Sequence, residues 1–287
     1  EVRAYNRAAE IDSILKELIG NKKRIGISFS SVSVKEYEHL KRLFTDAEFI
    51  DIDERVSKMR MIKDQEEIKI LREACKIASD VAEEITEYIK EGIREYELAA
   101  EITHLLLRNG AQDNAFTPIV AFDENSAEPH HFSGSRKLKR GDIVLMDFGA
   151  RYKKYNSDIT RTYVFGKADE RIKRMYEVVF EAQRLALDSV KSGAMGSDVD
   201  KKARDYIDST EFKGSFIHSL GHGIGLAVHD HPALGPNSNL VLENGMVITV
   251  EPGVYVKGFG GVRIEDDVLV GENSEVLTTA SKDLIEL

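Results

Sequence analysis

Two distant stretches of the chain repeat one pattern, and this repeat constrains the fold more than any other feature. The first reads RGDIVLMDFGAR (140–151) and the second NGMVITVEPGVY (244–255). Each has a glycine, five mostly apolar residues, an acid, one further residue and a second glycine. Another acid follows in each case, with Asp158 eleven residues after Asp147 and Glu265 fourteen after Glu251. The spacing predicts two similar β-hairpins, each with one acid from either strand on the same face.

The position of Asp147 raises a question of charge. It follows the apolar run IVLM, where a carboxylate loses its hydration and needs a compensating positive charge. The run contains no lysine or arginine, so the partner comes from elsewhere in the chain or is a metal ion. Two buried strands with acids at their ends would also produce this pattern. If the two hairpins meet, however, four carboxylates come together.

Histidines concentrate near these acids. Six of the eight lie between residues 130 and 231, and four of them fall within FIHSLGHGIGLAVHDHP. His222 stands between two glycines, where backbone crowding is low and a side chain can reach a shared site. A single histidine is more often an ordinary core or surface residue, but this cluster favours a ligand or a catalytic group.

The candidate ligands are oxygen-rich. Cys75 is the only cysteine, and it lies in the apolar stripe of a predicted helix, so we assign it to the core. Such a set favours Mn²⁺ or Co²⁺, with Fe²⁺ and Zn²⁺ as alternatives, over a structural zinc site. Four carboxylates suit two ions about 3.5–4 Å apart, which lower the pKa of a shared water and yield a hydroxide nucleophile. The predicted reaction class is metal-assisted hydrolysis.

The chain divides into two parts in sequence. Residues 1–55 read as helix, strand, helix, strand, an α/β fragment, and because the sequence begins at Glu1 we expect it to start inside a longer polypeptide. Residues 56–63 are basic and are predicted to be a linker. Residues 64–287 form the larger domain, which opens with a helix capped by Asp64 and Glu67. Further helices are predicted up to about Gly110, over about 169–191 and from Ser197, which pairs with Asp200 in a second cap. Strands dominate the rest, so the predicted class is α+β.

Composition excludes some functions. The net charge of −10 argues against nucleic-acid binding, which requires clustered cations. No apolar run approaches the roughly 20 residues of a membrane helix. A single cysteine fits a reducing compartment, so we expect a cytoplasmic protein.

The motifs DFG, SDITRT, HSLGHGIGL, EPGVY and GVRIED together resemble those of the pita-bread metallopeptidases. The resemblance covers about residues 56–287 and is strongest to the proline-specific branch, the Xaa-Pro dipeptidases (prolidases) and aminopeptidase P. It implies that residues 1–55 are the later part of the small amino-terminal α/β domain of that branch. Methionine aminopeptidases share the ligand types, but their last two glutamates lie much farther apart. The resemblance implies a fold with pseudo-twofold halves around an antiparallel sheet, a homodimer, and hydrolysis of Xaa-Pro bonds in dipeptides or short peptides.

The resemblance also implies a metal-ligand set. Its members are Asp147, Asp158, His222, Glu251 and Glu265. Asp158 and Glu265 would bridge the two ions, Asp147 would bind one ion, and His222 and Glu251 would bind the other. Glu251 would also carry a proton from the water to the leaving nitrogen.

Other residues take supporting roles by the same resemblance. His130 would stabilise the oxyanion, His229 would contact the substrate, and His218 would be a further catalytic histidine. Arg263 would orient a metal-bound carboxylate or bind the substrate carboxylate. Two residues are expected to donate hydrogen bonds to the ligands, namely Tyr155 and Thr160. His131 is expected to be only a neighbour of the site, and Arg161 to be solvated.

Two alternatives stay open at this point. The chain could be a non-catalytic pita-bread module that holds a peptide, although the complete ligand set argues against this. The motifs also do not separate a dipeptidase from an aminopeptidase P.

Overall fold

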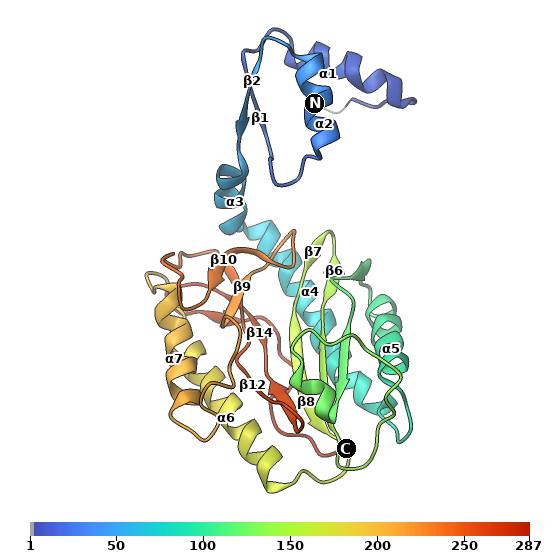
Figure 1. Cartoon of the computed structure of the whole chain (residues 1–287), viewed down its shortest axis with the longest axis vertical. Helices are drawn as coiled ribbons and strands as arrows, with labels where there is room; N and C mark the ends of the chain where they lie inside the picture. The colour runs from blue at the N-terminus through green and yellow to red at the C-terminus, as the bar shows by residue number, and fades with distance from the viewer. Residues whose placement is uncertain (1–2) are drawn as a thin grey trace. The chain divides into compact units, whose positions relative to one another are not determined.

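The computed structural model describes residues 3–287, which divide into two compact units between Met59 and Arg60 (Figure 1). The first unit contains α1 (Ile11–Ile19), β1 (Arg24–Ile27), α2 (Val34–Leu43) and β2 (Glu48–Asp51). The two strands pair in parallel. The predicted order of helix, strand, helix, strand is therefore confirmed.

The segment predicted as a linker, residues 56–63, includes the later part of a helix and contains the boundary between the two units. Helix α3 spans Asp53–Met61 and begins with two acids, Asp53 and Glu54. These acids, which are favourable at a helix start, precede the basic segment, so the composition of residues 56–63 alone did not indicate a helix. Directly after α3, the backbone N–H of Lys63 donates to the carbonyl of Gly245, which fixes this point on the larger unit.

Four long helices belong to the larger unit. They are α4 (Gln65–Glu84), α5 (Glu95–Arg108), α6 (Glu170–Leu187) and α7 (Gly196–Asp208). Asp64 and Glu67 form the predicted capping box of α4. The cap predicted for α7 is wrong, because the helix begins at Gly196 with no side-chain cap. Asp200 instead accepts hydrogen bonds from Arg204 and from the backbone of Leu220.

The first predicted hairpin is present. Strand β5 (Ile143–Phe148) pairs antiparallel with β8 (Ile159–Val164), and Asp147 lies opposite Thr160. The chain between them continues as β6 (Ala150–Tyr152) and β7 (Tyr155–Asn156), and β4 (Ile119–Phe122) and β3 (Asp113–Asn114) pair with β5 and β6. A β-carbon on Gly149 would lie 1.8 Å from the carbonyl oxygen of Ser157, so only glycine fits.

The second hairpin has the same design. Strand β11 (Val247–Val250) pairs antiparallel with β14 (Asp266–Leu269), and the chain between them forms the paired strands β12 (Gly253–Val256) and β13 (Gly260–Arg263). Strands β9 (Gly221–Gly223), β10 (Asp230–Leu234) and β15 (Glu275–Val276) complete its sheet, in the order β10-β9-β11-β14-β15. The repeat in the sequence therefore corresponds to a repeat in the structure.

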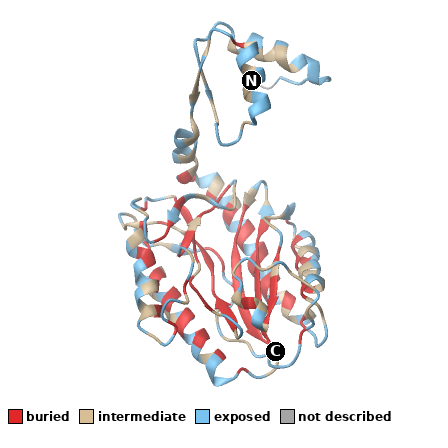
Figure 2. Ribbon diagram, viewed as in Figure 1, coloured by how far each residue is buried: buried red, intermediate tan, exposed pale blue. Residues whose placement is uncertain are grey.

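Buried strands lie at the centre of the larger unit, and helices cover them (Figure 2). Apolar residues of α4 and α5 pack with the first hairpin, and those of α6 and α7 pack with the second. The halves join where the carbonyl of Thr160 in β8 accepts from the N–H of Glu265, at 3.2 Å. The predicted α+β class is confirmed. Among residues 3–287, no helix is long and apolar enough to cross a membrane.

Candidate metal centre

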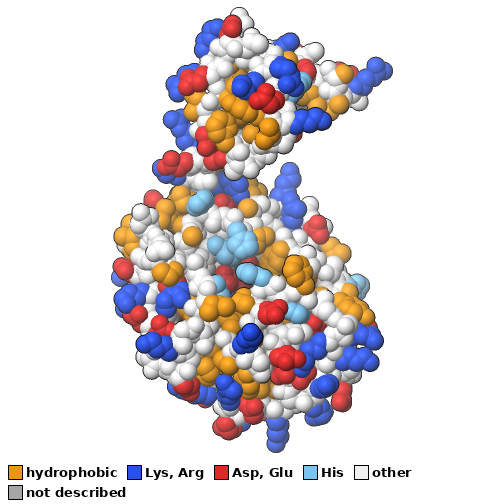
Figure 3. All heavy atoms as spheres, in the orientation of Figure 1, with side chains coloured by type: hydrophobic (Ala, Val, Ile, Leu, Met, Phe, Trp, Pro, Cys, Tyr) orange, Lys and Arg blue, Asp and Glu red, His pale blue; other side chains and the backbone are white. Residues whose placement is uncertain are grey.

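The four predicted acidic ligands line one cleft of about 350 Å³ in the larger unit. Asp147 lies near the end of β5 and Asp158 just before β8, while Glu251 follows β11 and Glu265 precedes β14. Figure 3 shows histidine side chains gathered around a hollow with acidic atoms on its floor. Each hairpin thus contributes two carboxylates, as the repeat predicts.

His222 is oriented as a ligand. Its Nδ1 lies 3.0 Å from the carbonyl oxygen of Gly223, and since a carbonyl only accepts, Nδ1 carries the proton. The unprotonated Nε2 therefore faces the acids, 3.7 Å from Asp158 Oδ2 and 3.4 Å from Glu251 Oε1. Burial lowers the pKa of His222 to about 4, which keeps the ring neutral. A neutral imidazole with a free Nε2 is the form that binds metals.

The acids repel one another. Burial, and then the charge of Glu265, raise the pKa of Asp158 well above its ordinary value of 3.8. Burial raises the pKa of Glu251 to about 8, and burial with the charge of Glu251 raises that of Glu265. Without a cation, Glu251 therefore holds a proton at neutral pH, and the neighbouring acids are shifted in the same direction.

The donor set fits divalent cations. Ligand atoms of Asp158, His222 and Glu265 lie within 4.8 Å of one another. Within residues 3–287, the Oδ1 atoms of Asp147 and Asp158 are buried and have no hydrogen-bond partner. Such oxygens are costly unless a cation compensates them, and Arg263 supplies only one positive charge here.

The positive partner of Asp147 within the chain is Arg263. Its Nη2 lies 2.5 Å from Asp147 Oδ2, and the guanidinium is almost fully buried. This contact corresponds to the first of the two expected roles, the orientation of a ligand carboxylate. A contact between Arg263 and a substrate carboxylate stays a prediction.

Comparison with known proteins agrees with this geometry. The model of metallopeptidase family M24 matches residues 69–272, and that of the creatinase/prolidase N-terminal domain matches residues 1–62. This chain belongs to metallopeptidase family M24. The Xaa-Pro dipeptidase of Pyrococcus furiosus is 42% identical over 270 residues, which are 94% of this chain and 77% of that protein.

Solved structures of M24 peptidases share the fold. The Xaa-Pro dipeptidase from Bacillus anthracis superposes with a TM-score of 0.92 at 41% identity, covering 97% of this chain and 78% of that one. The X-Pro aminopeptidase from Thermotoga maritima has a TM-score of 0.93 at 36% identity, covering 100% and 81%. The expected pita-bread fold is therefore confirmed, and this M24 member is a metallopeptidase.

The two expected hydrogen-bond donors to the ligands behave differently in this M24 peptidase. Thr160 Oγ1 donates to Glu265 Oε2 at 2.6 Å and accepts from Arg263 Nε at 3.0 Å. The expectation for Tyr155 is wrong, because its hydroxyl donates to Glu67 Oε1 at 2.7 Å. Tyr155 begins the two-residue strand β7 after a tight turn, so its direction did not follow from the spacing of the acids.

The three expected cleft histidines, His130, His218 and His229, all line the cavity. The ring of His229 lies 4.3 Å from that of His222, centroid to centroid. His218 donates through Nδ1 to the carbonyl of Ser219 at 2.8 Å, so its Nε2 is an acceptor. Burial lowers the pKa of His218 to about 4.

Tyr255 is a residue of this region that the sequence analysis missed. Its hydroxyl lies 2.9 Å from Arg263 Nη1, which donates to it, and 2.8 Å from His218 Nε2. Since that nitrogen accepts, the tyrosine donates, and a chain of hydrogen bonds runs from Arg263 to His218. The available signal was strand alternation, because Glu251, Gly253 and Tyr255 follow every second position from the acid.

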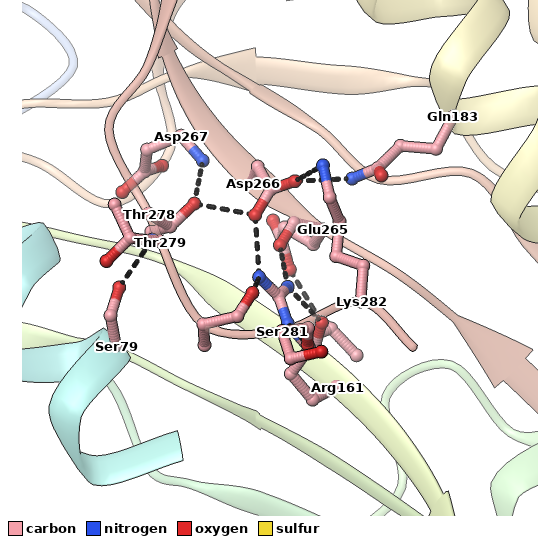
Figure 4. A network of polar contacts seen from close by, with 12 residues as sticks. Ser79, Arg161, Gln183, Glu265, Asp266, Asp267, Thr278, Thr279, Ser281 and Lys282 are labelled. Atoms are coloured by element: carbon pink, nitrogen blue, oxygen red, sulfur yellow. Dashed lines mark hydrogen bonds and ion pairs between the residues drawn. The ribbon is translucent and has the colours of Figure 1, made fainter. Parts of the chain in front are cut away.

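The prediction that Arg161 is solvated was wrong. The side chain is fully buried. It donates to the carbonyl oxygens of Thr160 and Glu265 and forms an ion pair with Asp266 at 2.8 Å (Figure 4). The remaining partners of this network include Gln183, Thr278, Ser281 and Lys282. Arg161 therefore connects β8, β14 and the C-terminal segment next to the predicted metal ligands Asp158 and Glu265.

Cys75 and Asp267 also lie behind the ligands. Cys75 is fully buried, which confirms its assignment to the core, and its Sγ lies 3.2 Å from Asp267 Oδ2. The same oxygen accepts from the backbone N–H of Asp158 at 2.9 Å. Asp267 therefore fixes the backbone of a predicted ligand from the second hairpin.

Proposed function

We propose that this M24 metallopeptidase hydrolyses Xaa-Pro bonds, with dipeptidase activity as the first candidate and aminopeptidase activity as the second. The observation that carries the proposal is the complete set of four acids and one neutral histidine in a single buried cleft. Relatives at 42–43% identity that are named Xaa-Pro dipeptidases support the choice of bond.

Two divalent cations would be held by the five ligands. Asp158 and Glu265 come from different hairpins and, with His222, offer ligand atoms within 4.8 Å, so they are suited to bridging. Asp147 would bind one ion, and His222 with Glu251 the other. When bound, such ions lower the pKa of water and polarise the scissile carbonyl. The oxygen-rich ligand set favours Mn²⁺ or Co²⁺.

Glu251 is suited to transfer the proton. Its carboxylate lines the cleft together with the other predicted ligands, where the attacking water would be bound. Its Oε1 is fixed by Thr249 Oγ1 at 3.1 Å. Glu251 would accept a proton from the attacking water and deliver it to the proline nitrogen, which has no N–H of its own.

The walls of the cleft suit a short peptide. Three apolar side chains, those of Phe116, Ile119 and Val228, line it beside the histidines. Because a pyrrolidine ring is apolar and compact, such walls can bind it while polar groups orient the scissile bond. His130 would stabilise the oxyanion, and His229 and Arg263 would contact the substrate.

Hydrolysis of Leu-Pro and Leu-Pro-Pro tests the proposal. The metal-free protein should be inactive, and added Mn²⁺ or Co²⁺ should restore cleavage of Leu-Pro, while a chelator should abolish it. Faster cleavage of Leu-Pro-Pro would identify an aminopeptidase. A metal-loaded protein that binds but does not cleave any proline peptide would favour the alternative, a non-catalytic peptide-binding module.

We further propose a cytoplasmic homodimer. The dimer follows from the resemblance to the proline-specific branch, and the compartment from the single cysteine, which suits a reducing environment. Light scattering should give about twice the mass of 32.2 kDa, and a monomer would contradict the first part.

A further inference from the structure

We infer that Glu95 and His131 form a positioning pair that holds the loop carrying His130 against the cleft. The inference rests on the proposed function, because it assigns the pair a role in orienting His130 toward the reacting carbonyl. Neither residue lines the cleft, and the sequence analysis treated His131 only as a neighbour of the site. Both are positioning residues, since they act through His130.

Glu95 is a fully buried carboxylate at the first position of α5. Its Oε1 accepts from the backbone N–H of Phe122 at 2.9 Å and from Asn125 Nδ2 at 2.8 Å. Its Oε2 accepts from His131 Nε2 at 2.9 Å and from the backbone N–H of Gly134 at 2.8 Å. Four donors therefore converge on one side chain, and two of them belong to the segment that follows His130.

The geometry requires a carboxylate. Each oxygen of Glu95 faces one backbone N–H, from Phe122 or from Gly134, and a backbone N–H cannot become an acceptor. A glutamine at this position would direct its NH₂ group toward one of these backbone N–H groups. Two donors would then face each other, and neither would have an acceptor. The start of a helix additionally favours a negative side chain. The four donors therefore match the two acceptor oxygens of a carboxylate and no other side chain of this shape.

The loop is also held at Pro129, before His130, and at Ser133, after it. The carbonyl of Pro129 accepts from Arg263 Nη1 at 3.5 Å, and Ser133 Oγ bonds to the N–H of Val120 at 2.8 Å. Among residues 3–287, no partner forms a hydrogen bond with the imidazole of His130, which lines the cleft. The backbone around His130 is thus fixed while its ring stays available to a substrate, which is how a group is preorganised for catalysis.

The experiment uses Mn²⁺-loaded full-length protein and the substrate Leu-Pro. His131→Leu removes the hydrogen-bond donor to Glu95, whereas His131→Gln keeps a donor. The matched control is His104→Leu, because His104 is exposed on helix α5, the helix that carries Glu95. We expect His131→Leu to lower kcat by about 10- to 100-fold with unchanged metal content, as small misplacements of catalytic groups do. His131→Gln should recover most of kcat, and His104→Leu should match the wild type.

A double-mutant cycle separates positioning from general stability. In a His130→Ala background, His131→Leu should cause no further loss of kcat, because its effect passes through His130. A second full loss in that background, or no loss in the single variant, would overturn the inference.

A second measurement does not depend on turnover. In the metal-free protein, amide hydrogen exchange of Gly134 should accelerate at least about tenfold in His131→Leu and not in His104→Leu. Unchanged exchange would overturn the pair even if the wild type cleaves proline peptides. A wild type that cleaves none of them, with accelerated exchange in His131→Leu, would instead refute the proposed function and leave the loop anchoring standing.

Discussion

Asp158 is the predicted ligand that contacts residues of both halves of the larger unit. Its backbone is held by Asp267 of the second hairpin, and its side chain lies between His222 and the other acids. A hydrogen bond to the second hairpin therefore fixes the backbone of this first-hairpin residue.

Asp158→Asn should abolish turnover and weaken metal binding. The amide carries no charge and brings N–H donors toward the cations, so we expect kcat to fall by roughly 1,000-fold or more. Metal content after dialysis and turnover of Leu-Pro measure the two effects. Asp198→Asn, at an exposed position of α7, is the control and should leave both unchanged. Near-normal activity in Asp158→Asn would contradict its assignment as a bridging ligand.

Thr160 is not itself a predicted ligand, but it forms a hydrogen bond to the predicted ligand Glu265. Thr160→Val keeps the shape of the side chain but removes the hydroxyl that donates to Glu265 and accepts from Arg263. We expect metal affinity to fall by about 10- to 100-fold, which competition with a fluorescent chelator would measure. Thr160→Ser retains the hydroxyl and should bind metal as the wild type does. Equal affinities in all three proteins would show that the hydrogen bond does not orient Glu265.

At the scale of elements, Arg161 holds β8 and β14 in register behind the ligands. Its guanidinium is wholly buried, and its ion pair with Asp266 is fully buried as well. Lys282, which also contacts Asp266, is partly exposed. The two cations therefore offer a matched comparison around one carboxylate.

Arg161→Met should destabilise the metal-free protein by about 3–5 kcal/mol, because it leaves Asp266 with an incompletely compensated buried charge. Lys282→Met should cost clearly less, since that amine is partly solvated and Arg161 remains. Urea unfolding followed by circular dichroism compares them. Equal losses in the two variants would mean that the ion pair of Arg161 is not the principal contact of the network.

The elements differ in how far the sequence predicted them. The hairpins followed from the repeat because both strands are short, apolar and closed by glycines, so local pattern and tertiary structure agree. The burial of Arg161 did not follow, because its partner Asp266 lies 105 residues away. The prediction for Tyr155 was wrong for a related reason. The turn before Tyr155 sets the direction of its side chain, and its hydrogen-bond partner Glu67 lies in a different element. Partners that only the tertiary fold brings together leave no local signal.

At the scale of the whole molecule, the metal-free cleft makes stability depend on pH. The pKa of Glu251 is about 8 in the folded state against an ordinary value of 4.5, so between these values the folded state binds more protons than the unfolded chain. Stability therefore falls as pH rises through this window. His218 and His222 have the opposite effect on the free energy of unfolding. Their pKa values are lowered from 6.5 to about 4 in the folded state, so the protein loses stability as pH drops below 6.5.

The urea midpoint of the metal-free protein should thus fall as pH rises from about 6.5 toward about 9, where the two histidines no longer change their charge. Bound Mn²⁺ should remove most of the decline above pH 7, because the cations replace the protons on the acids. Urea titrations at several pH values, with and without metal, test this. A midpoint that rises between pH 7 and 9 in the metal-free protein would contradict the raised pKa of Glu251.

The distribution of ligands between the hairpins has a mechanical consequence. Asp147 and Asp158 belong to the first half, whereas His222, Glu251 and Glu265 belong to the second. Cations bound by all five residues would cross-link the two halves, so that the halves could separate only if the cations dissociated. If the chain is cleaved in the connection at 166–168, between β8 and α6, each separate fragment should bind Mn²⁺ weakly. Tight binding should return only when the two fragments reassociate.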